Sequence, residues 1–266
     1  MLEAPPPRAQ LASPRVSWAE LRAAVRAQQP WLSAPQAGST RLCPVCRGPA
    51  GSGRARCFQC DLHWQCAAGS LADVVVPVAF AIKGTVHARR LWQYKSPRVT
   101  APEATGHAAT IRAMLLVFLR DHGPCLWRSA GSDPPTHVAV VPTARRRPGR
   151  HPLRSLLEGY LTIPWARLVP TPDGERLRDL DPDRFRAAPL PAARVLLIDD
   201  TWTTGSSAQS AAMALRAAGV SSVMTVVLGR HVSALMAGRS GLGPAAMPFR
   251  MDSCAAHQDH PVGSRP

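Results

Sequence analysis

The sequence predicts an α/β fold in which a doubly wound parallel sheet follows a small cysteine-rich module. Apolar stretches of strand length alternate with helical patterns along most of the chain, as in parallel sheets covered by helices. Four cysteines occur as two close pairs near the N-terminus, and a length of 266 residues with 45% apolar residues suffices for both parts. We expect four regions: residues 1–36 as a disordered segment with a short docking helix, 37–70 as the cysteine module, 71–235 as the α/β domain, and 236–266 as a disordered tail.

The first region begins with residues 1–16, which are rich in Pro, Ala and Arg and therefore favour disorder. Ser17 and Glu20 have the spacing of a capping box, which predicts that a helix begins here. Leu21 and Val25 give this helix an apolar side. We expect that side to dock on the core.

The two cysteine pairs are Cys43-x2-Cys46 and Cys57-x2-Cys60, separated by ten residues. Thiolates with this spacing are typical of tetrahedral structural zinc sites. Redox chemistry is the competing interpretation for a single pair, and the presence of two pairs disfavours it. A degenerate knuckle that has lost its metal is the remaining alternative.

Other possible sulfur and imidazole ligands are scattered along the chain. His63 and Cys66 lie close enough in sequence to act as substitute or outer ligands of the zinc site. Cys125 and Cys254 have no patterned partner and are expected to be ordinary core or tail thiols. A cytosolic chain would keep its thiols reduced, which argues against disulfides.

Hydrophobic periodicity places the remaining elements. Ala108–Asp121 carries the clearest amphipathic helical pattern. The apolar stretch Leu71–Ile82 predicts a strand that is broken or bent at Pro77. The other expected elements are strands at 137–142, 195–198 and 222–228, and helices at 153–161 and 206–218.

The segment 195–207 carries the most chemistry. A buried strand leads into Asp199 and Asp200, and a loop rich in hydroxyl groups and glycine then opens a helix. Ligands of open α/β sheets bind at such carboxyl ends of strands, and backbone N–H groups at a helix N-terminus favour phosphate. The alternative is a simple helix-capping turn, which would need only one of these polar residues. A P-loop is excluded, because no Gly-Lys-Ser/Thr occurs in the chain.

This segment resembles the phosphoribosyl-pyrophosphate (PRPP) motif of the type I phosphoribosyltransferases. The resemblance implies that Asp199 and Asp200 hold the ribose 2′- and 3′-hydroxyls. Thr201 and Trp202 stand where the family has two aliphatic residues. Thr203 stands where some members carry a carboxylate that acts as a base toward the incoming nucleobase. The residues implied to wrap the 5′-phosphate are Thr203, Thr204, Gly205, Ser206 and Ser207.

A zinc knuckle ahead of such a domain resembles the ComF-like family over approximately residues 40–232. The resemblance implies a Rossmann-like type I phosphoribosyltransferase domain and a Mg²⁺-assisted transfer from PRPP to a nitrogenous acceptor that the sequence does not identify. The alternative is a non-catalytic regulator that binds PRPP or a nucleotide, or a DNA-uptake accessory protein. Residues 170–193 stand where the family has a mobile hood over the site, and a plain surface loop is the alternative. Tyr94-Lys95 stands where the family has a Tyr-Lys-like element, and a solvated basic loop is the alternative.

Arginines follow the expected strand at 137–142, where family members carry a different loop. We expect Arg145, Arg146 and Arg147 to bind pyrophosphate, since arginine forks match phosphate oxygens. A solvated basic turn is the alternative.

The formal net charge of +15 comes almost wholly from arginine. Such a field attracts polyanions and makes nucleic acid a further candidate partner, although a GC-rich coding bias would also produce arginine in place of lysine. No stretch approaches the ~20 apolar residues of a membrane span, and no signal peptide is recognisable, so we expect a cytoplasmic protein without a membrane partner. The sequence does not define an oligomeric state.

Overall fold

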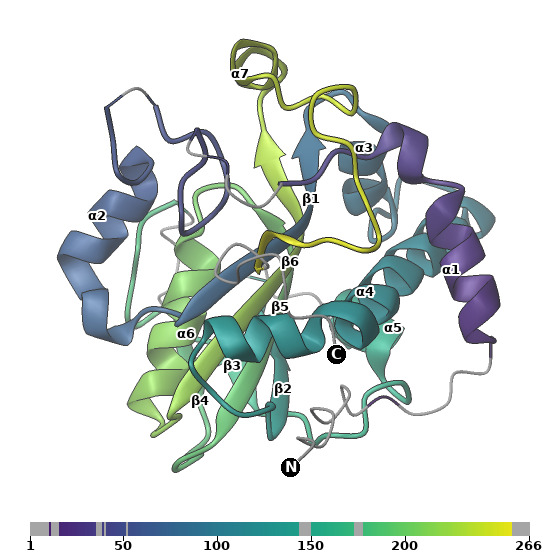
Figure 1. The fold of residues 1–266 in the computed structure, drawn as a ribbon. Coiled ribbons are helices and arrows are strands. Elements are labelled where there is room, and N and C mark those ends of the chain that lie inside the picture. Colours follow the sequence, from purple (N-terminus) through teal and green to yellow (C-terminus); the bar gives the residue numbers. More distant parts are fainter. Residues whose placement is uncertain are drawn as a thin grey trace, which may run out of the picture.

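Four parallel strands form the central sheet in the order β1-β6-β5-β2 (Figure 1). The computed structural model describes residues 11, 16–35, 39, 41–51, 53–143, 150–172 and 178–256. The strands of this sheet are β1 (Val74–Ile82), β2 (His137–Val140), β5 (Arg194–Trp202) and β6 (Ser222–Val232). A separate antiparallel pair consists of β3 (Leu168–Pro170) and β4 (Phe185–Ala187).

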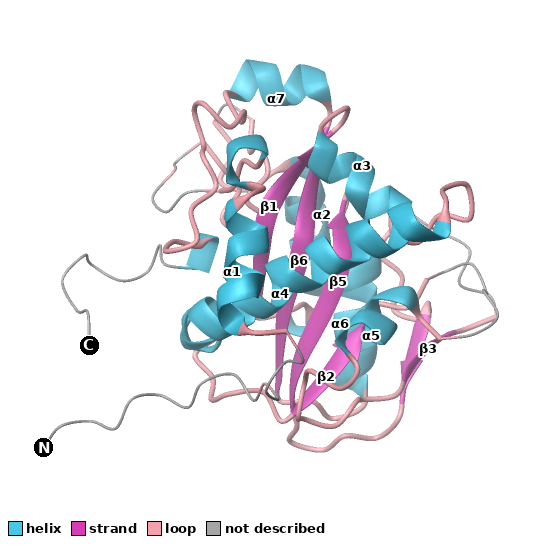
Figure 2. Ribbon diagram, turned by 90° about the vertical axis from the view of Figure 1, so that its right-hand side faces the viewer, coloured by secondary structure: helices cyan, strands magenta, loops and turns pink. Residues whose placement is uncertain are grey.

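Helices cover both faces of the sheet, which confirms the predicted α/β class with a parallel sheet (Figures 1 and 2). One face carries α1 (Trp18–Arg26), α3 (Val86–Gln93), α4 (Ala101–Ser129) and α5 (Pro152–Leu157). The opposite face carries α2 (Phe58–Ala67), from the cysteine module, and α6 (Ser206–Ala217). The remaining elements are α7 (Ala234–Ser240) and short 3₁₀ turns at Gln29–Trp31 and Ala68–Ser70.

The buried strands β5 and β6 form the centre of the sheet. Val195, Leu197 and Ile198 are fully buried, as expected for a strand covered on both faces. β5 is longer than its apolar stretch predicts, because its pairing with β6 continues from Asp199 through Trp202. Both acidic residues therefore belong to the end of β5 and not to the loop that follows it.

The structure corrects the predicted break in β1, since the strand runs without interruption through Pro77. β1 is an edge strand, and an edge strand has an unpaired side on which a missing N–H costs nothing.

α4 exceeds its predicted length. It begins at a capping box formed by Thr100 and Glu103, with Pro102 in its first turn, and continues past Pro124.

Two expectations for the first helix are confirmed. Ser17 and Glu20 form the capping box that starts α1, and α1 docks on α4 through buried Leu21 and Val25.

None of the helices in the described part of the chain combines the length and apolar character that a bilayer span requires.

The chain beyond α7 is ordered as far as residue 256, although it lacks hydrophobic periodicity. Ala34 N donates to Met247 O at 3.1 Å, and Phe249 N donates to Leu32 O at 3.2 Å. Cys254 and the two alanines that follow it are buried in the core beside α4. The expected tail over 236–266 therefore differs from the structure as far as residue 256. Its contacts are irregular, so no periodic signal marks them.

Candidate functional site

The four paired cysteines form a buried cluster on the α6 face of the sheet. Their sulfur atoms lie within 4.8 Å of one another, and the Sγ atoms of Cys46 and Cys57 are 3.7 Å apart. A tetrahedral zinc with bonds of about 2.3 Å would place its sulfurs roughly 3.8 Å apart. The local turn closes where Cys43 N donates to Gly48 O at 2.8 Å. The residues positioned to hold a metal ion are Cys43, Cys46, Cys57 and Cys60.

The thiols of this cluster cannot all ionise without a cation. Hydrogen bonding to Cys46 lowers the pKa of Cys43, whereas hydrogen bonding to Cys43 raises the pKa values of Cys57 and Cys60. A divalent metal ion would stabilise the four thiolates together, because it offsets part of their negative charge. Within the described residues, neither His63 nor Cys66 belongs to this ligand group.

Asp199 and Asp200 lie at the carboxyl end of β5 and face different surroundings. Asp200 is buried and points toward α3, where Tyr94 Oη donates to its Oδ2 at 2.6 Å and Lys95 Nζ donates to the same oxygen. The Oδ1 atom of Asp199 instead accepts the backbone N–H of Asp200 at 2.8 Å. Successive strand residues point to opposite faces, so the strand alone does not aim both carboxylates at one point.

Asp199 has an unusual protonation equilibrium. Its pKa is raised to about 7, first by burial and second by the negative charge of Asp200, against the lowering effect of Lys95. Backbone N–H groups of Asp200 and Thr201 also favour its carboxylate form. Near neutral pH this side chain therefore exchanges its proton readily, and a nearby cation would favour the charged form.

The loop after β5 turns sharply at Gly205, whose φ is +87°. A Cβ at this position would lie 2.0 Å from the Trp202 ring, so only glycine fits between the buried indole and the start of α6. Thr204 Oγ1 accepts the backbone N–H of Ser206 at 3.3 Å, and glycine itself supplies no side-chain cap. Thr203 is exposed, and Ser207 is partly exposed. This helix N-terminus therefore carries hydroxyl and N–H donors together.

Arg184 is a residue of this site that sequence patterns do not single out. Its side chain is fully buried beside the start of α6, where Nη1 donates to Ser207 Oγ at 3.1 Å. Nη2 donates to the backbone carbonyl of Asp179 at 2.6 Å. Burial lowers the pKa of Arg184, while the charges of Asp181 and Asp179 raise it. A buried cation at the positive end of a helix creates a local field that favours an anion.

Arg230, on β6, connects the loop to the cysteine module. Its Nη1 donates to the backbone carbonyls of Trp202 at 3.1 Å and Thr203 at 3.0 Å. The same guanidinium lies against Gly48 of the first knuckle, where a Cβ would come within 2.5 Å of Nη2. One buried side chain therefore touches both the metal-binding turn and the loop after β5.

A cavity of about 730 Å³ opens at the carboxyl ends of β1, β5 and β6. Asp200 and Thr201 border it, but the loop residues 203–207 do not. The other polar and aromatic residues that line the cavity are Lys83, Thr85, Arg89, Trp92, Lys95 and His231. The pKa of His231 is lowered first by burial and then by the charges of Arg230 and Lys83, so its imidazole is mainly neutral at pH 7.

The arginines predicted to bind pyrophosphate, Arg145, Arg146 and Arg147, lie outside the described residues. The chain leading to them runs beside the end of β5, since Val141 N donates to Ile198 O at 3.0 Å.

Comparison with protein-family models, curated proteins and solved structures finds no match to this chain. Its function therefore has to be inferred from the chemistry of these clusters.

Proposed function

We propose that the chain binds PRPP at the end of β5, in a domain of the type I phosphoribosyltransferase kind. The observation that carries the proposal is the order of groups from the end of β5 to the start of α6. A buried acid at the strand end is followed by a hydroxyl-rich turn with a glycine at φ +87°, and then by a helix N-terminus beside buried Arg184. These groups suit a ligand that is neutral and hydroxylated at one end and anionic at the other. A ribose 5-phosphate ester has that character.

The ribose and its phosphate divide between two subsites in this proposal. Asp199 and Asp200 accept the ribose hydroxyls. Tyr94 Oη and Lys95 Nζ both donate to Oδ2 of Asp200, so Oδ1 is the natural acceptor for a sugar hydroxyl. Residues 203–207 enclose the 5′-phosphate, and Arg184 behind Ser207 provides a buried positive charge.

Pyrophosphate requires further cations and a metal. Arg145, Arg146 and Arg147 remain candidates. Lys83 and Arg89 are exposed in the adjoining cavity, and Lys95 also borders it. Mg²⁺ would bind mainly to substrate oxygens and water, as its preference for hard ligands dictates. We further propose zinc as the ion of the cysteine cluster and the cytoplasm as the location of the protein.

The proposed reaction is attack of a nitrogen nucleophile on C1′, with departure of pyrophosphate carrying the electron pair of the broken C–O bond. Positive charge develops on the ribose in the transition state, and the two carboxylates stabilise it electrostatically. No carboxylate stands at Thr203, so proton removal from the acceptor falls to another group. His231 is a neutral imidazole in the cavity wall and has the chemistry of a general base.

Pyrophosphate release separates a transferase from a PRPP sensor. The purified protein with PRPP and Mg²⁺ is screened against nucleobases and small amines. A transferase releases pyrophosphate with at least one acceptor and loses this activity in Asp199→Asn at saturating PRPP. A sensor binds PRPP without release, and this result would retain the site while removing the catalytic proposal.

Nucleic acid is the second candidate ligand, favoured by the surface of the cysteine module. Phe58 and Trp64 of α2 are 64% and 47% exposed. The guanidinium of Arg56 lies 4.3 Å from the Trp64 ring, and that of Arg54 lies 6.0 Å from the Phe58 ring. Exposed rings with cations suit stacking of single-stranded bases. Steeply salt-dependent DNA binding that is lost in Trp64→Ala would support this candidate, and salt-independent or absent binding would exclude it.

A further inference from the structure

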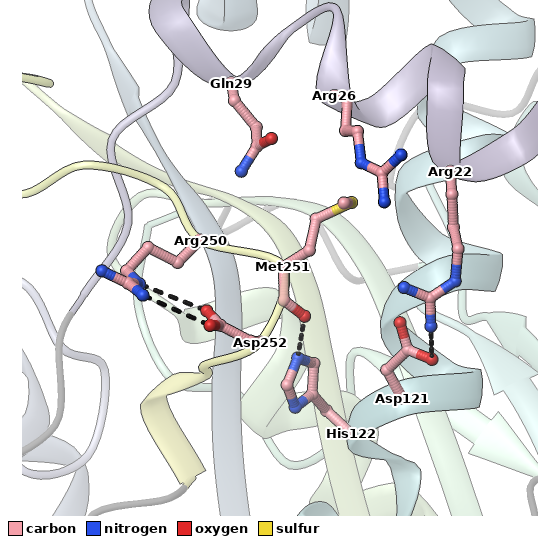
Figure 3. A pocket seen from close by; sticks show the side chains of 8 residues that line it. All are labelled: Arg22, Arg26, Gln29, Asp121, His122, Arg250, Met251 and Asp252. Atoms are coloured by element: carbon pink, nitrogen blue, oxygen red, sulfur yellow. Dashed lines mark hydrogen bonds and ion pairs between the residues drawn. The ribbon is translucent and has the colours of Figure 1, made fainter.

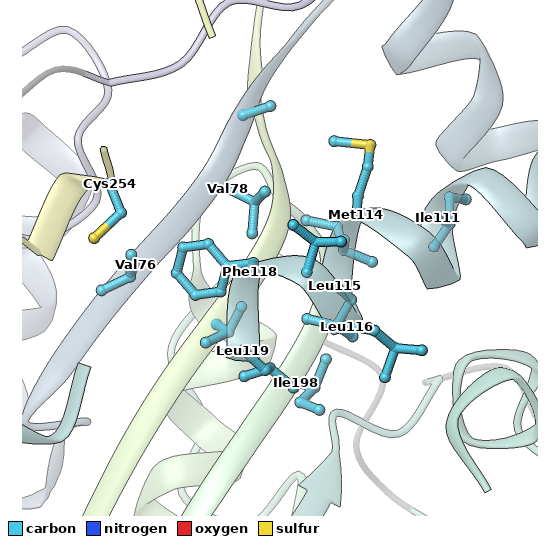
Figure 4. Close-up of a cluster of buried hydrophobic side chains, with 14 of the residues drawn as sticks. Val76, Val78, Ile111, Met114, Leu115, Leu116, Phe118, Leu119, Ile198 and Cys254 are labelled. Atoms are coloured by element: carbon cyan, nitrogen blue, oxygen red, sulfur yellow. The ribbon is translucent and has the colours of Figure 1, made fainter. Parts of the chain in front are cut away.

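A second group of soft ligands lies on the α4 face of the sheet, away from the four-cysteine cluster. One ring nitrogen of His122 and the Sγ atoms of Cys125 and Cys254 all lie within 4.8 Å of one another. His122 and Cys125 are three residues apart on α4, so they project from one side of the helix. Cys254 is supplied by the C-terminal segment, which packs against the same core (Figure 4).

The hydrogen bonding of His122 suits a metal ligand. Its Nε2 lies 2.9 Å from the carbonyl oxygen of Met251 (Figure 3). Because a carbonyl only accepts, Nε2 carries a proton, and Nδ1 is the ring nitrogen that can bind a metal ion. Metal-bound histidines commonly donate their other N–H to a backbone carbonyl in this way. Phe118, with its ring centroid 5.4 Å away, further restricts the orientation of the imidazole.

The surroundings leave room for one more ligand. A small cavity of about 20 Å³ borders both His122 and Cys254, which is the space of about one water molecule. A larger cavity of about 710 Å³ is also lined by His122 (Figure 3). Two arginines that line it are paired with acids, Arg22 with Asp121 at 2.5 Å and Arg250 with Asp252 at 3.2 Å. Solvent can therefore approach the imidazole.

We propose that His122, Cys125 and Cys254 bind a second zinc ion, with water as the fourth ligand. Two thiolates and one imidazole form a donor set typical of zinc sites that keep an open position. Binding of Zn²⁺ replaces the two thiol protons, which are released to solvent, and leaves a site without net charge. The ion would join the C-terminal third of α4 to the C-terminal segment, so it would also hold residues 251–256 against the core.

Zinc content per chain tests the proposal in protein purified without chelator. We expect two zinc ions in the wild type and one in Cys125→Ser/Cys254→Ser. The Cys43→Ser/Cys46→Ser variant should retain one, and the control Cys66→Ser, at an exposed cysteine, should retain two. Equal zinc content in the wild type and Cys125→Ser/Cys254→Ser would overturn the proposal.

A second measurement uses the unaltered chain, so that a folding defect in a variant cannot decide the result. Native protein is alkylated with and without a chelator, and the modified cysteines are identified by mass spectrometry. The proposal predicts that Cys125 becomes at least several-fold more reactive after chelation, while Cys66 reacts equally in both samples. Reactivity of Cys125 that is indifferent to chelator, or a Cys125–Cys254 disulfide in the native protein, would overturn it.

Discussion

Two clusters on the α6 face of the sheet call for ligands of opposite charge. The four buried thiols can ionise together only around a cation. The start of α6 presents N–H groups, hydroxyls and buried Arg184, which together favour an anion. Arg230 touches both clusters through Gly48 on one side and the carbonyls of Trp202 and Thr203 on the other. One buried arginine therefore connects a cluster suited to a cation with a cluster suited to an anion.

The two clusters also differ in how they are assembled. The cysteines come from one short segment whose own turns bring them together, so a bound metal ion would be the main source of order in that module. The groups around the end of β5 and the start of α6 instead come from separate elements: Tyr94 and Lys95 follow α3, Arg184 precedes β4, and Arg230 lies on β6. Loss of one such group should affect ligand binding more than folding.

Removal of the metal should have the largest effect. Cys43→Ser or Cys57→Ser leaves three thiolates, and structural zinc sites contribute about 10–16 kcal/mol of apparent binding free energy to small zinc modules. We expect loss of one zinc ion and exposure of the α6 side of the core, measured as a large fall in Tm and increased binding of a hydrophobic dye. Cys66→Ser should match the wild type. A variant with full metal content would contradict the assignment of its cysteine.

Gly205→Ala should follow in size, because it acts on the anion site alone. An alanine there takes an unfavourable φ of +87° and meets the Trp202 ring at 2.0 Å. Backbone strain and overpacking together cost on the order of 2–4 kcal/mol. The matched control is Gly238→Ala in α7, where nothing lies within 4 Å of the added methyl group. Urea unfolding of both variants measures the difference, and equal midpoints would contradict the packing described for this loop.

Arg230→Met tests whether the two clusters are coupled. It removes a charged donor from three carbonyls, those of Trp202, Thr203 and His231, and hydrogen bonds to charged groups contribute about 1.5–3 kcal/mol. We expect faster loss of zinc to a chelator and weaker PRPP binding in the same variant. Arg239→Met, at an exposed position of α7, is the control. If only one of the two properties changes, the clusters are independent.

The most gradual predicted effect is a pH dependence from Asp199, because it is spread over several pH units. Its pKa is about 7 in the folded protein against an ordinary value of 3.8. Between these values the folded state holds the extra proton, so its contribution to stability falls as pH rises, by at most about 1.4 kcal/mol per pH unit. Asp199→Asn cannot lose this proton. The Tm difference between variant and wild type should therefore grow in favour of the variant from pH 5 to pH 8, and a constant difference would contradict the raised pKa.

The sequence predicts the local parts of both clusters better than the distant ones. Two cysteine pairs define a metal site by spacing alone, because the turn that joins them is local. Asp200 and Gly205 are equally visible, since they stand between an apolar strand and a helix. Arg184 is not, because only the packing of the segment before β4 against α6 brings its guanidinium to Ser207. Cys254 illustrates the same limit, since it meets α4 through a segment without periodicity.

The measurement that tests the central claim most directly is calorimetric titration with PRPP and Mg²⁺. The account predicts saturable binding to the wild type and at least about tenfold weaker binding to Asp200→Asn, since a charge-assisted acceptor is worth about 1.5–3 kcal/mol. Asp133→Asn, at an exposed position before β2, should bind as the wild type does. Failure of the wild type to bind PRPP at millimolar concentration, or unchanged affinity in Asp200→Asn, would contradict a ribose-phosphate site at the end of β5.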